Sequence, residues 1–343
     1  MDEGIESRKI IHNILKLIKI DSLTYDESFI KLLSNKDINT LNKKFIHNTV
    51  LTAVRNFIAV KKIILDLSPT IDQDSDSFFI LLSAITQLLY LKMKKYAVVN
   101  STVELSKKKE ILTSHKFING CLRNFLRKKD AFSKFKINYN DLPKWFINET
   151  KNLNYHEKKN FVESLKKQPS IHLVFKEEKY IKKYLKYGST TSSNSLCLNK
   201  NYSIKDIPNI NDGEWWVQDF SAMLPLSEIN FLEYKKIADV GSAPGGKLFQ
   251  ILSKNKNVTA FEKNKKRTLK LNENLKRLKF DIHVEPLNFL NIQNDNKFDL
   301  IIIDAPCSSV GTIKRNPEIF LKKRIPDFKY LLKTQKNLLE KAK

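Results

Sequence analysis

Cysteine is scarce in this sequence of 343 residues, which contains only Cys121, Cys197 and Cys307. Three widely spaced cysteines, an odd number, exclude a disulfide framework and a paired Cys-X-X-Cys metal site. The six histidines are scattered, and none stands at metal-ligand spacing beside a cysteine or carboxylate cluster, so we expect no metal site. Any chemistry of the cysteines is therefore expected to be catalytic.

Long apolar runs and a surplus of acidic residues are also missing. No uncharged apolar run approaches the roughly 18 to 20 residues that span a bilayer, and the first residues lack the order of a secretory signal. We predict a cytoplasmic monomer with no membrane contact. The 61 Lys and Arg exceed the 37 Asp and Glu, which gives a formal charge of +24. This sign agrees with a polyanionic partner such as RNA, although codon bias in an AT-rich genome also enriches lysine.

The first part of the chain, residues 1–135, has apolar residues at helical spacing and almost no strand pattern. Helices are predicted over 77–92, 97–108 and 114–128, within a total of about five to seven. Cys121 falls in the last of these helices, where a buried, inert role is expected. The sequence thus predicts an all-α domain.

Residues 136–230 are less regular and predict a small α+β subdomain. Strands are expected over 171–175 and 214–220, and the polar run 188–195 is interpreted as a turn or loop. Trp215 and Trp216 are adjacent in the second strand. Packing of one in the core is the simpler role, and stacking of the other on a base is the alternative.

From residue 231 to residue 343, strand and helix patterns alternate, which predicts a doubly wound parallel sheet. A glycine-rich turn follows the strand 237–240 and opens a helix, so its backbone can approach a nucleotide-like ligand closely. Glu262 ends the next strand, where an acid can accept hydrogen bonds from both ribose hydroxyls. The residues of the turn are Gly241, Ser242, Ala243, Pro244, Gly245, Gly246 and Lys247.

A third segment, Asp304-Ala305-Pro306-Cys307, follows the apolar strand 300–303. It places a carboxyl group, a rigid turn and a thiol at the rim where ligands of such sheets bind. Because Cys307 stands at the end of a strand rather than inside it, a chemical role is favoured over inert burial.

The segments APGGK (243–247) and DAPCSSVGTIKRNPE (304–318) together resemble the NOL1/NOP2/Sun family of RNA cytosine-C5 methyltransferases. WWVQDFSAMLP (215–225) is similar to the same family. YAVVNSTVELSKK (96–108) and FINGCLRNFL (117–126) resemble the NusB-type RNA-binding domain that precedes the bacterial Sun-type enzymes of small-subunit rRNA. The resemblance implies a NusB-like helical domain, a linking α+β subdomain and a Rossmann-like methyltransferase domain.

The same resemblance implies roles for individual residues. S-adenosylmethionine would lie along 241–247, Glu262 would hold its ribose, and Asn288 would stand near its adenine. Asp304 would face the methyl donor and the target base, and Cys307 would match the thiol that assists product release. In this chemistry a thiolate first adds at C6 of cytosine, because C5 is otherwise a poor nucleophile.

One departure concerns the attacking cysteine, which in the family lies in a later Thr-Cys-Ser segment that this sequence lacks. We expect that about a quarter of the enzyme is missing, that the sheet is incomplete beside the strand 300–303, and that the chain is inactive alone. Two alternatives stay open: Cys307 is itself the nucleophile, or the chain is a non-catalytic NusB-like RNA-binding protein or an inactive fragment.

Overall fold

The computed structural model describes residues 3–34, 36–165, 167–293 and 297–343. Its contacts divide the chain into two compact units. The helical unit comprises Met1–Gln168 together with Ser309–Pro326, and the sheet unit comprises Pro169–Ser308 together with Asp327–Lys343. The boundaries 1–135, 136–230 and 231–343 stay a prediction from sequence.

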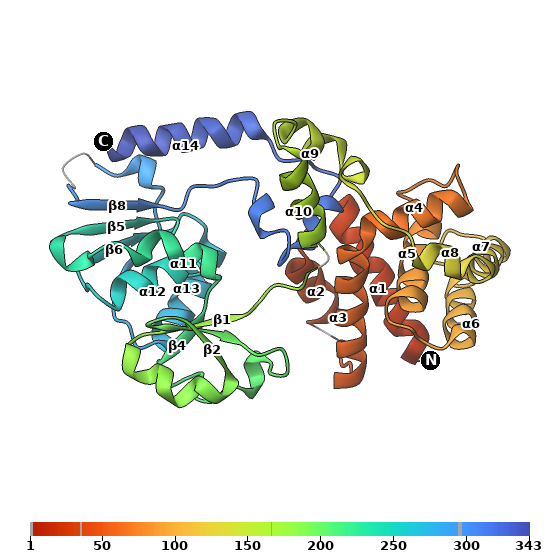
Figure 1. Ribbon diagram of the computed structural model, residues 1–343, viewed down its shortest axis with the longest axis horizontal. Coiled ribbons are helices and arrows are strands. Elements are labelled where there is room, and N and C mark those ends of the chain that lie inside the picture. Colours follow the sequence, from red (N-terminus) through yellow and green to blue (C-terminus); the bar gives the residue numbers. More distant parts are fainter. Residues whose placement is uncertain (1–2, 35, 166, 294–296) are drawn as a thin grey trace. The chain divides into compact units, whose positions relative to one another are not determined.

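The helical unit is built mainly from α-helices (Figure 1). Within its described residues up to Ser133 it has eight helices rather than the five to seven predicted, because α8 is very short and one residue, Asn56, separates α3 from α4. None of the described helices is long and apolar enough to cross a membrane. The helices are α1 (Glu3–Ile20), α2 (Tyr25–Leu33), α3 (Thr40–Arg55), α4 (Phe57–Leu67), α5 (Asp76–Leu89), α6 (Lys95–Ser106), α7 (His115–Arg127), α8 (Lys129–Ser133), α9 (Lys144–Glu149) and α10 (Tyr155–Leu165).

Helix α5 is the centre of this unit. Its N-cap Ser75 accepts a hydrogen bond from the backbone N–H of Phe78, which satisfies a group that the first turn leaves open. Twelve of its 14 residues are buried, so apolar neighbours must cover it on all sides. The predicted helices 77–92, 97–108 and 114–128 correspond to α5, α6 and α7, and Cys121 in α7 is buried as predicted.

The segment 309–326, distant in sequence, packs into the helical unit. Leu321 is 2% exposed and belongs to the same apolar cluster as α1 and α5. The ring of Phe320 lies 5.2 Å from that of Phe146 in α9. Lys323 Nζ forms an ion pair of 2.7 Å with Asp74 Oδ2. This segment is therefore anchored by both apolar and charged contacts.

The sheet unit contains two four-stranded sheets, with strand orders β2-β3-β1-β4 and β7-β6-β5-β8. The first sheet is antiparallel, and the second is parallel throughout, as the alternating pattern predicted. The strands are β1 (His172–Phe175), β2 (Gly188–Ser192), β3 (Ser195–Leu198), β4 (Trp215–Val217), β5 (Ile237–Val240), β6 (Val258–Phe261), β7 (Val284–Glu285) and β8 (Leu300–Ile303). The helices are α11 (Phe220–Ser227), α12 (Gly246–Leu252), α13 (Lys265–Arg277) and α14 (Phe328–Ala342).

The polar run 188–195 is not the predicted loop, because it forms most of the hairpin β2-β3. Its hydroxyl groups satisfy one another: the Ser195 Oγ, which is buried, lies 2.7 Å from Thr191 Oγ1 and 2.6 Å from Ser192 Oγ. β-Branched threonine also favours extended backbone. The Ser- and Thr-rich composition alone indicated a loop. Hydrogen bonds between these hydroxyl groups allow the segment to form strands instead.

Both Trp215 and Trp216 are buried, with 1% and 2% of their surfaces exposed. Adjacent strand residues point to opposite faces, and both faces of β4 are covered here. Trp215 packs with Phe175 in one apolar cluster, and Trp216 packs with Phe249 of α12 in another. Stacking of either ring on a base is therefore excluded in this conformation.

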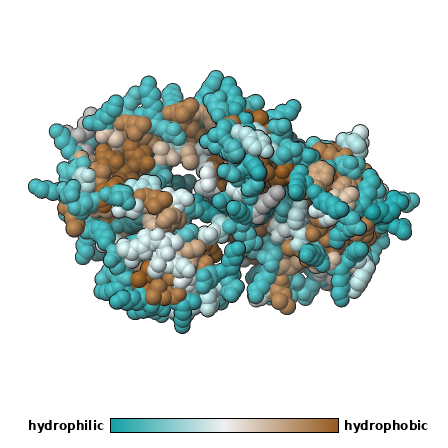
Figure 2. All heavy atoms as spheres, in the orientation of Figure 1, coloured by the Kyte–Doolittle hydropathy of each residue, from teal (hydrophilic) through white to brown (hydrophobic). Residues whose placement is uncertain are grey.

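The parallel sheet places three strand ends side by side. Val240 of β5 pairs with Phe261 of β6 and with Ile303 of β8, so the carboxyl ends of these strands meet at one edge. Within the described residues β8 pairs with β5 alone, in agreement with the flank expected to be unpaired. Hydrophobic side chains gather where α14 and β8 lie in Figure 2, and a groove there is lined by Ile301, Ile303 and Leu332, among others.

Candidate functional site

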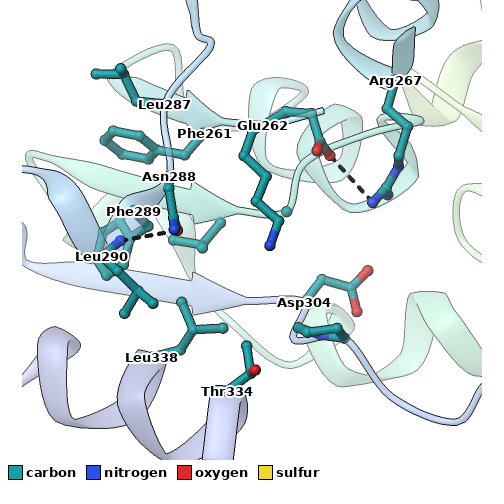
Figure 3. A pocket seen from close by; sticks show the side chains of 14 residues that line it. Phe261, Glu262, Arg267, Leu287, Asn288, Phe289, Leu290, Asp304, Thr334 and Leu338 are labelled. Atoms are coloured by element: carbon teal, nitrogen blue, oxygen red, sulfur yellow. Dashed lines mark hydrogen bonds and ion pairs between the residues drawn. The ribbon is translucent and has the colours of Figure 1, made fainter. Parts of the chain in front are cut away.

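A cavity opens at the carboxyl edge of the parallel sheet, where the three segments singled out in the sequence meet. Four of the predicted site residues line it: Gly241, Glu262, Asn288 and Asp304. Figure 3 shows Thr334 and Leu338 of α14 on one side of this cavity, with Phe261 and Leu287 opposite. The cavity therefore combines polar strand ends with an apolar wall.

The turn after β5 can be formed only by glycine at its first position. Gly241 has φ of +81°, and a Cβ there would lie 2.8 Å from the carbonyl oxygen of Asp304. Its N–H donates to the carbonyl of Phe261 over 2.9 Å. The turn is thus fixed between the ends of β6 and β8, and a side chain at this position would displace the Asp304 backbone.

Only Gly241 of the predicted turn 241–247 lines the cavity described above. Ser242 and Ala243 are buried behind it, and Pro244, Gly245 and Gly246 lead into α12. Gly245 has φ of +117°, and the ring of Phe249 occupies the space that a Cβ would need. Most of the turn therefore shapes the backbone rather than the surface of the cavity.

Lys247, the last residue of the turn, reaches Asp304 at the end of β8. Its Nζ lies 2.7 Å from Asp304 Oδ1, with 24% and 54% of the two side chains exposed. The N–H of Asp304 donates to the carbonyl of Val240 over 2.9 Å. The carboxylate is thus held at the rim of the cavity while half of it stays open to solvent.

Glu262 is 3% exposed and is held from three directions. Its Oε2 accepts a hydrogen bond from the N–H of Ala243 at 3.4 Å, and its Oε1 accepts one from the N–H of Asn264 at 3.0 Å. Arg267 Nη1 lies 3.5 Å from Oε2, the ion pair drawn in Figure 3. The carboxylate is therefore fixed in place by two backbone N–H groups and one guanidinium group.

Asn288 and Cys307 differ in their relation to the cavity. Asn288 lines it, and its Oδ1 accepts the N–H of Leu290 at 3.3 Å. The adjacent Phe289 packs edge-on against Phe261, with ring centroids 5.4 Å apart. Cys307 is exposed in the segment after β8 and does not line this cavity.

Sequence reasoning missed Asp239, which is fully buried in β5. Neither of its carboxylate oxygens has a hydrogen-bond partner among the described residues. Burial raises the pKa of Asp239 to about 7, and the nearby carboxylates of Asp304 and Glu262 act in the same direction. The only signal in the sequence is one acid within the apolar strand Ile237–Val240.

Two arginines of the basic helix α13 contact other parts of the sheet unit. Arg267 pairs with Glu262 and donates to the carbonyl of Ala243. Arg277 Nη1 donates to the carbonyls of Ile210 and Trp215, at 2.8 and 3.1 Å. Both guanidinium groups therefore hold the site and its surroundings together. Among the described residues, no three His, Cys, Asp or Glu side chains are arranged to hold a metal ion.

Comparison with known proteins identifies two regions of the chain. Residues 228–343 match the model of the 16S rRNA methyltransferase RsmB/F family, and residues 5–127 match that of the NusB family. These ranges contain the segments from which the resemblance was drawn, except for 215–225.

Curated relatives have names of the same kind. The ribosomal RNA small subunit methyltransferase B of Proteus mirabilis is 28% identical over 282 residues, which cover 76% of this chain and 66% of the relative. The probable ribosomal RNA small subunit methyltransferase B of Coxiella burnetii is 26% identical over 310 residues, 82% of this chain and 72% of the relative. The chain thus spans about two thirds of the length of these relatives.

The fold agrees with a solved structure described as the crystal structure of PH0851. It has a TM-score of 0.67 and 19% identity, and the match covers 99% of this chain and 82% of that one. A NusB-like helical region followed by a parallel α/β sheet is the arrangement that the sequence predicted. This chain is therefore similar to the RsmB/F family of rRNA methyltransferases over residues 228–343 and to the NusB family over residues 5–127.

Proposed function

We propose that this chain binds S-adenosylmethionine and takes part in the transfer of its methyl group to C5 of a cytosine in ribosomal RNA. The observation that carries the proposal is the cavity at the strand ends, where Gly241, Glu262, Asn288 and Asp304 converge. The match of residues 228–343 to the RsmB/F model and the names of the relatives support the same reaction class. The names of the relatives mention neither S-adenosylmethionine nor cytosine. These two parts of the proposal therefore rest on the resemblance and on the chemistry of the cavity.

The residues present fit S-adenosylmethionine. Glu262 is fixed and buried where a carboxylate can accept hydrogen bonds from ribose hydroxyls. Phe289 and Leu338 give an apolar wall beside Asn288, which suits a flat purine with a polar edge. The partnerless carboxylate of Asp239 lies at the base of the turn and favours a cationic ligand nearby.

The bound cofactor would supply an electrophilic methyl group. Lys247 would orient the carboxylate of Asp304 through Oδ1, which leaves Oδ2 to accept a hydrogen bond from the exocyclic amine of cytosine. Cys307 is exposed in the segment just after Asp304, where a thiol would assist release of the product. The Thr-Cys-Ser segment that supplies the attacking thiol in the family is absent from this sequence.

Calorimetry with S-adenosylmethionine tests the cofactor part of the proposal. We expect binding by the folded chain and at least tenfold weaker binding for Glu262→Gln, because a fixed charged acceptor is lost. Glu273→Gln on α13 is the matched control, since its side chain is 71% exposed. Equal affinity for the two variants, or no binding at all, would reject the cavity as the cofactor site.

The role of the thiol needs a separate experiment. An RNA that contains 5-fluorocytosine traps a covalent adduct with an attacking thiolate. If Cys307→Ser abolishes an adduct formed by the unchanged chain, Cys307 is the nucleophile. If the chain binds RNA and no adduct or methyl transfer occurs, the absence of Thr-Cys-Ser favours the alternative, a non-catalytic RNA-binding protein.

A further inference from the structure

A second cavity lies within the helical unit, separate from the cofactor cavity. Its walls come from the start of α2, the middle of α3 and the segment 309–326, and its volume is about 420 Å³. That segment begins two residues after Cys307 in the sequence, so the thiol and one wall of this cavity are close neighbours along the chain. No role for this space follows from the reaction proposed above.

One wall of this cavity contains the aromatic rings of Tyr25 and His47. The rings of Tyr25 and His47 meet edge-on at 5.4 Å, and Tyr25 Oη lies 2.6 Å from His47 Nδ1. Burial lowers the pKa of His47 and raises the pKa of Tyr25. At neutral pH the phenol therefore keeps its proton and donates to Nδ1, which assigns the imidazole hydrogen to Nε2.

The rest of the lining mixes apolar surface with charges of both signs. Leu51 and Ile319 supply the apolar part, and Asp26 and Glu318 supply carboxylates. Glu318 is 4% exposed, and its Oε1 accepts the N–H of Tyr25 at 3.4 Å, at the start of α2. Helix N-termini stabilise such a negative charge.

Two cations, Arg315 and Lys322, complete the lining. The Lys322 side chain is half-buried and forms no hydrogen bond or ion pair with another described residue. A site for phosphate alone would not include two carboxylates, because like charges repel. The edge of an unpaired base carries both donors and acceptors, its faces are apolar, and its neighbouring phosphate is negative. The lining matches all three features of a nucleotide.

We propose that this cavity holds one unpaired nucleotide of the RNA strand, with the base between Leu51 and Ile319 and its phosphate beside Lys322. This inference rests on the proposed function, in that RNA is the substrate. It adds a specific contact: the RNA strand is bound by the segment 309–326, which begins two residues after Cys307, through a base other than the target. The NusB-family domain is thereby tied to the RNA through α2 and α3.

The test measures binding of a fluorescent single-stranded RNA of about 12 nucleotides to the full-length chain, at several salt concentrations. Leu51→Trp fills the cavity without changing charge, and we expect about tenfold weaker binding with an unchanged salt dependence. Lys322→Ala is expected to weaken binding several-fold and to reduce the slope against log salt by about 1. The two variants thus distinguish the contribution of the base to RNA binding from that of the phosphate.

Matched controls lie on α3. Leu41→Trp adds the same ring at a residue that is 77% exposed, and Lys44→Ala removes the same charge from an exposed position that does not line the cavity. Both controls should bind RNA within twofold of the unchanged chain. Circular dichroism checks that each variant is folded.

The inference is overturned if folded Leu51→Trp binds RNA as the unchanged chain does, or if Lys322→Ala behaves like Lys44→Ala. It also fails if the unchanged chain binds no single-stranded RNA. Loss of S-adenosylmethionine binding is a separate outcome, because Glu262 and the cofactor cavity lie in the other unit. Calorimetry on the same variants therefore distinguishes failure of this inference from failure of the proposed function.

Discussion

Among the described residues each unit of this protein buries one aspartate, and the surroundings of the two carboxylates are opposite in kind. Asp76 in the helical unit is 5% exposed, and Asp239 in the sheet unit is fully buried. Asp76 Oδ1 lies 2.8 Å from Lys16 Nζ and 3.2 Å from His12 Nε2, and its Oδ2 accepts the N–H of Leu112 at 2.9 Å. Asp239 has no such partner among the described residues.

The pKa values of the two groups shift in opposite directions. Burial alone would raise the pKa of Asp76, but hydrogen bonds from Lys16 and Leu112 outweigh it and lower the pKa. Burial dominates at Asp239 and raises its pKa to about 7. A satisfied buried acid stabilises a fold, whereas a partnerless one costs stability and marks a place where a ligand can supply the partner.

The largest effect is expected for Asp239→Asn. In the unfolded chain this aspartate loses its proton near the ordinary pKa of 3.8, and in the folded chain it does so only near pH 7. The folded state therefore holds an extra proton between these values, and the free energy of unfolding falls as the pH rises through that window. This decrease in the free energy of unfolding is on the order of 4 kcal/mol for a shift of about three pKa units. The variant has no carboxyl group at this position, so its free energy of unfolding should not show the decrease.

Urea unfolding at about pH 4.5 and pH 7.5 measures this dependence for both proteins. The difference in the free energy of unfolding between the variant and the unchanged chain should move in favour of the variant at the higher pH. A difference that is the same at both pH values would mean that Asp239 has a partner in solution.

The second effect concerns Asp76→Asn, which we expect to lower the free energy of unfolding by about 2 kcal/mol at neutral pH. The pKa of Asp76 is lowered in the folded chain. The stability that its carboxylate contributes is therefore fully present above the pKa of the unfolded chain, and it is lost as the pH falls through the pKa of the folded chain. Asp74→Asn is the control, because its side chain is 32% exposed although it pairs with Lys19 and Lys323. We expect a cost below about 1 kcal/mol there. If Asp76→Asn and Asp74→Asn lower the free energy of unfolding equally, the difference in burial between the two carboxylates does not affect their contributions to stability.

The regular parts of this fold could be predicted because their signals are local. The spacing of apolar residues in α5 and the alternation that produces β5, β6 and β8 were read directly from the sequence. The hairpin β2-β3 was not predicted, because a run of Ser, Thr, Asn and Gly is typical of loops, whereas here the hydroxyls satisfy one another across the tight turn. Local composition therefore predicts elements well where burial follows a period, and poorly where polar groups satisfy one another.

The candidate site was predicted in part for a similar reason. Glu262 and Asp304 stand at strand ends, and a parallel sheet brings such ends together. The isolation of Asp239 and the docking of 309–326 depend on which distant residues become neighbours. The hydrogen bond between Tyr25 and Glu318, for example, joins residues 293 positions apart. No periodicity within one segment contains that information.

The smallest effect sharpens the contrast between the two units. Lys16 and Lys247 each pair with a carboxylate, at 2.8 and 2.7 Å, but the side chain of Asp76 is 4% exposed and that of Asp304 is 54% exposed. Lys16→Met should therefore cost about 1 to 2 kcal/mol, because a buried carboxylate loses a charged partner. Lys247→Met should change the free energy of unfolding by less than about 0.5 kcal/mol, because water solvates the carboxylate that it leaves.

Urea unfolding of both methionine variants at neutral pH decides the matter, provided that the two slopes against urea agree. If Lys247→Met costs as much as Lys16→Met, the Asp304 pair is a structural bond like that of Asp76. If Lys247→Met changes the free energy of unfolding little but weakens the binding of S-adenosylmethionine or RNA, the charge of Lys247 contributes to ligand binding rather than to stability. The two pairs have nearly the same length, so any difference in cost must come from the burial of the carboxylate and its remaining partners rather than from the bond itself.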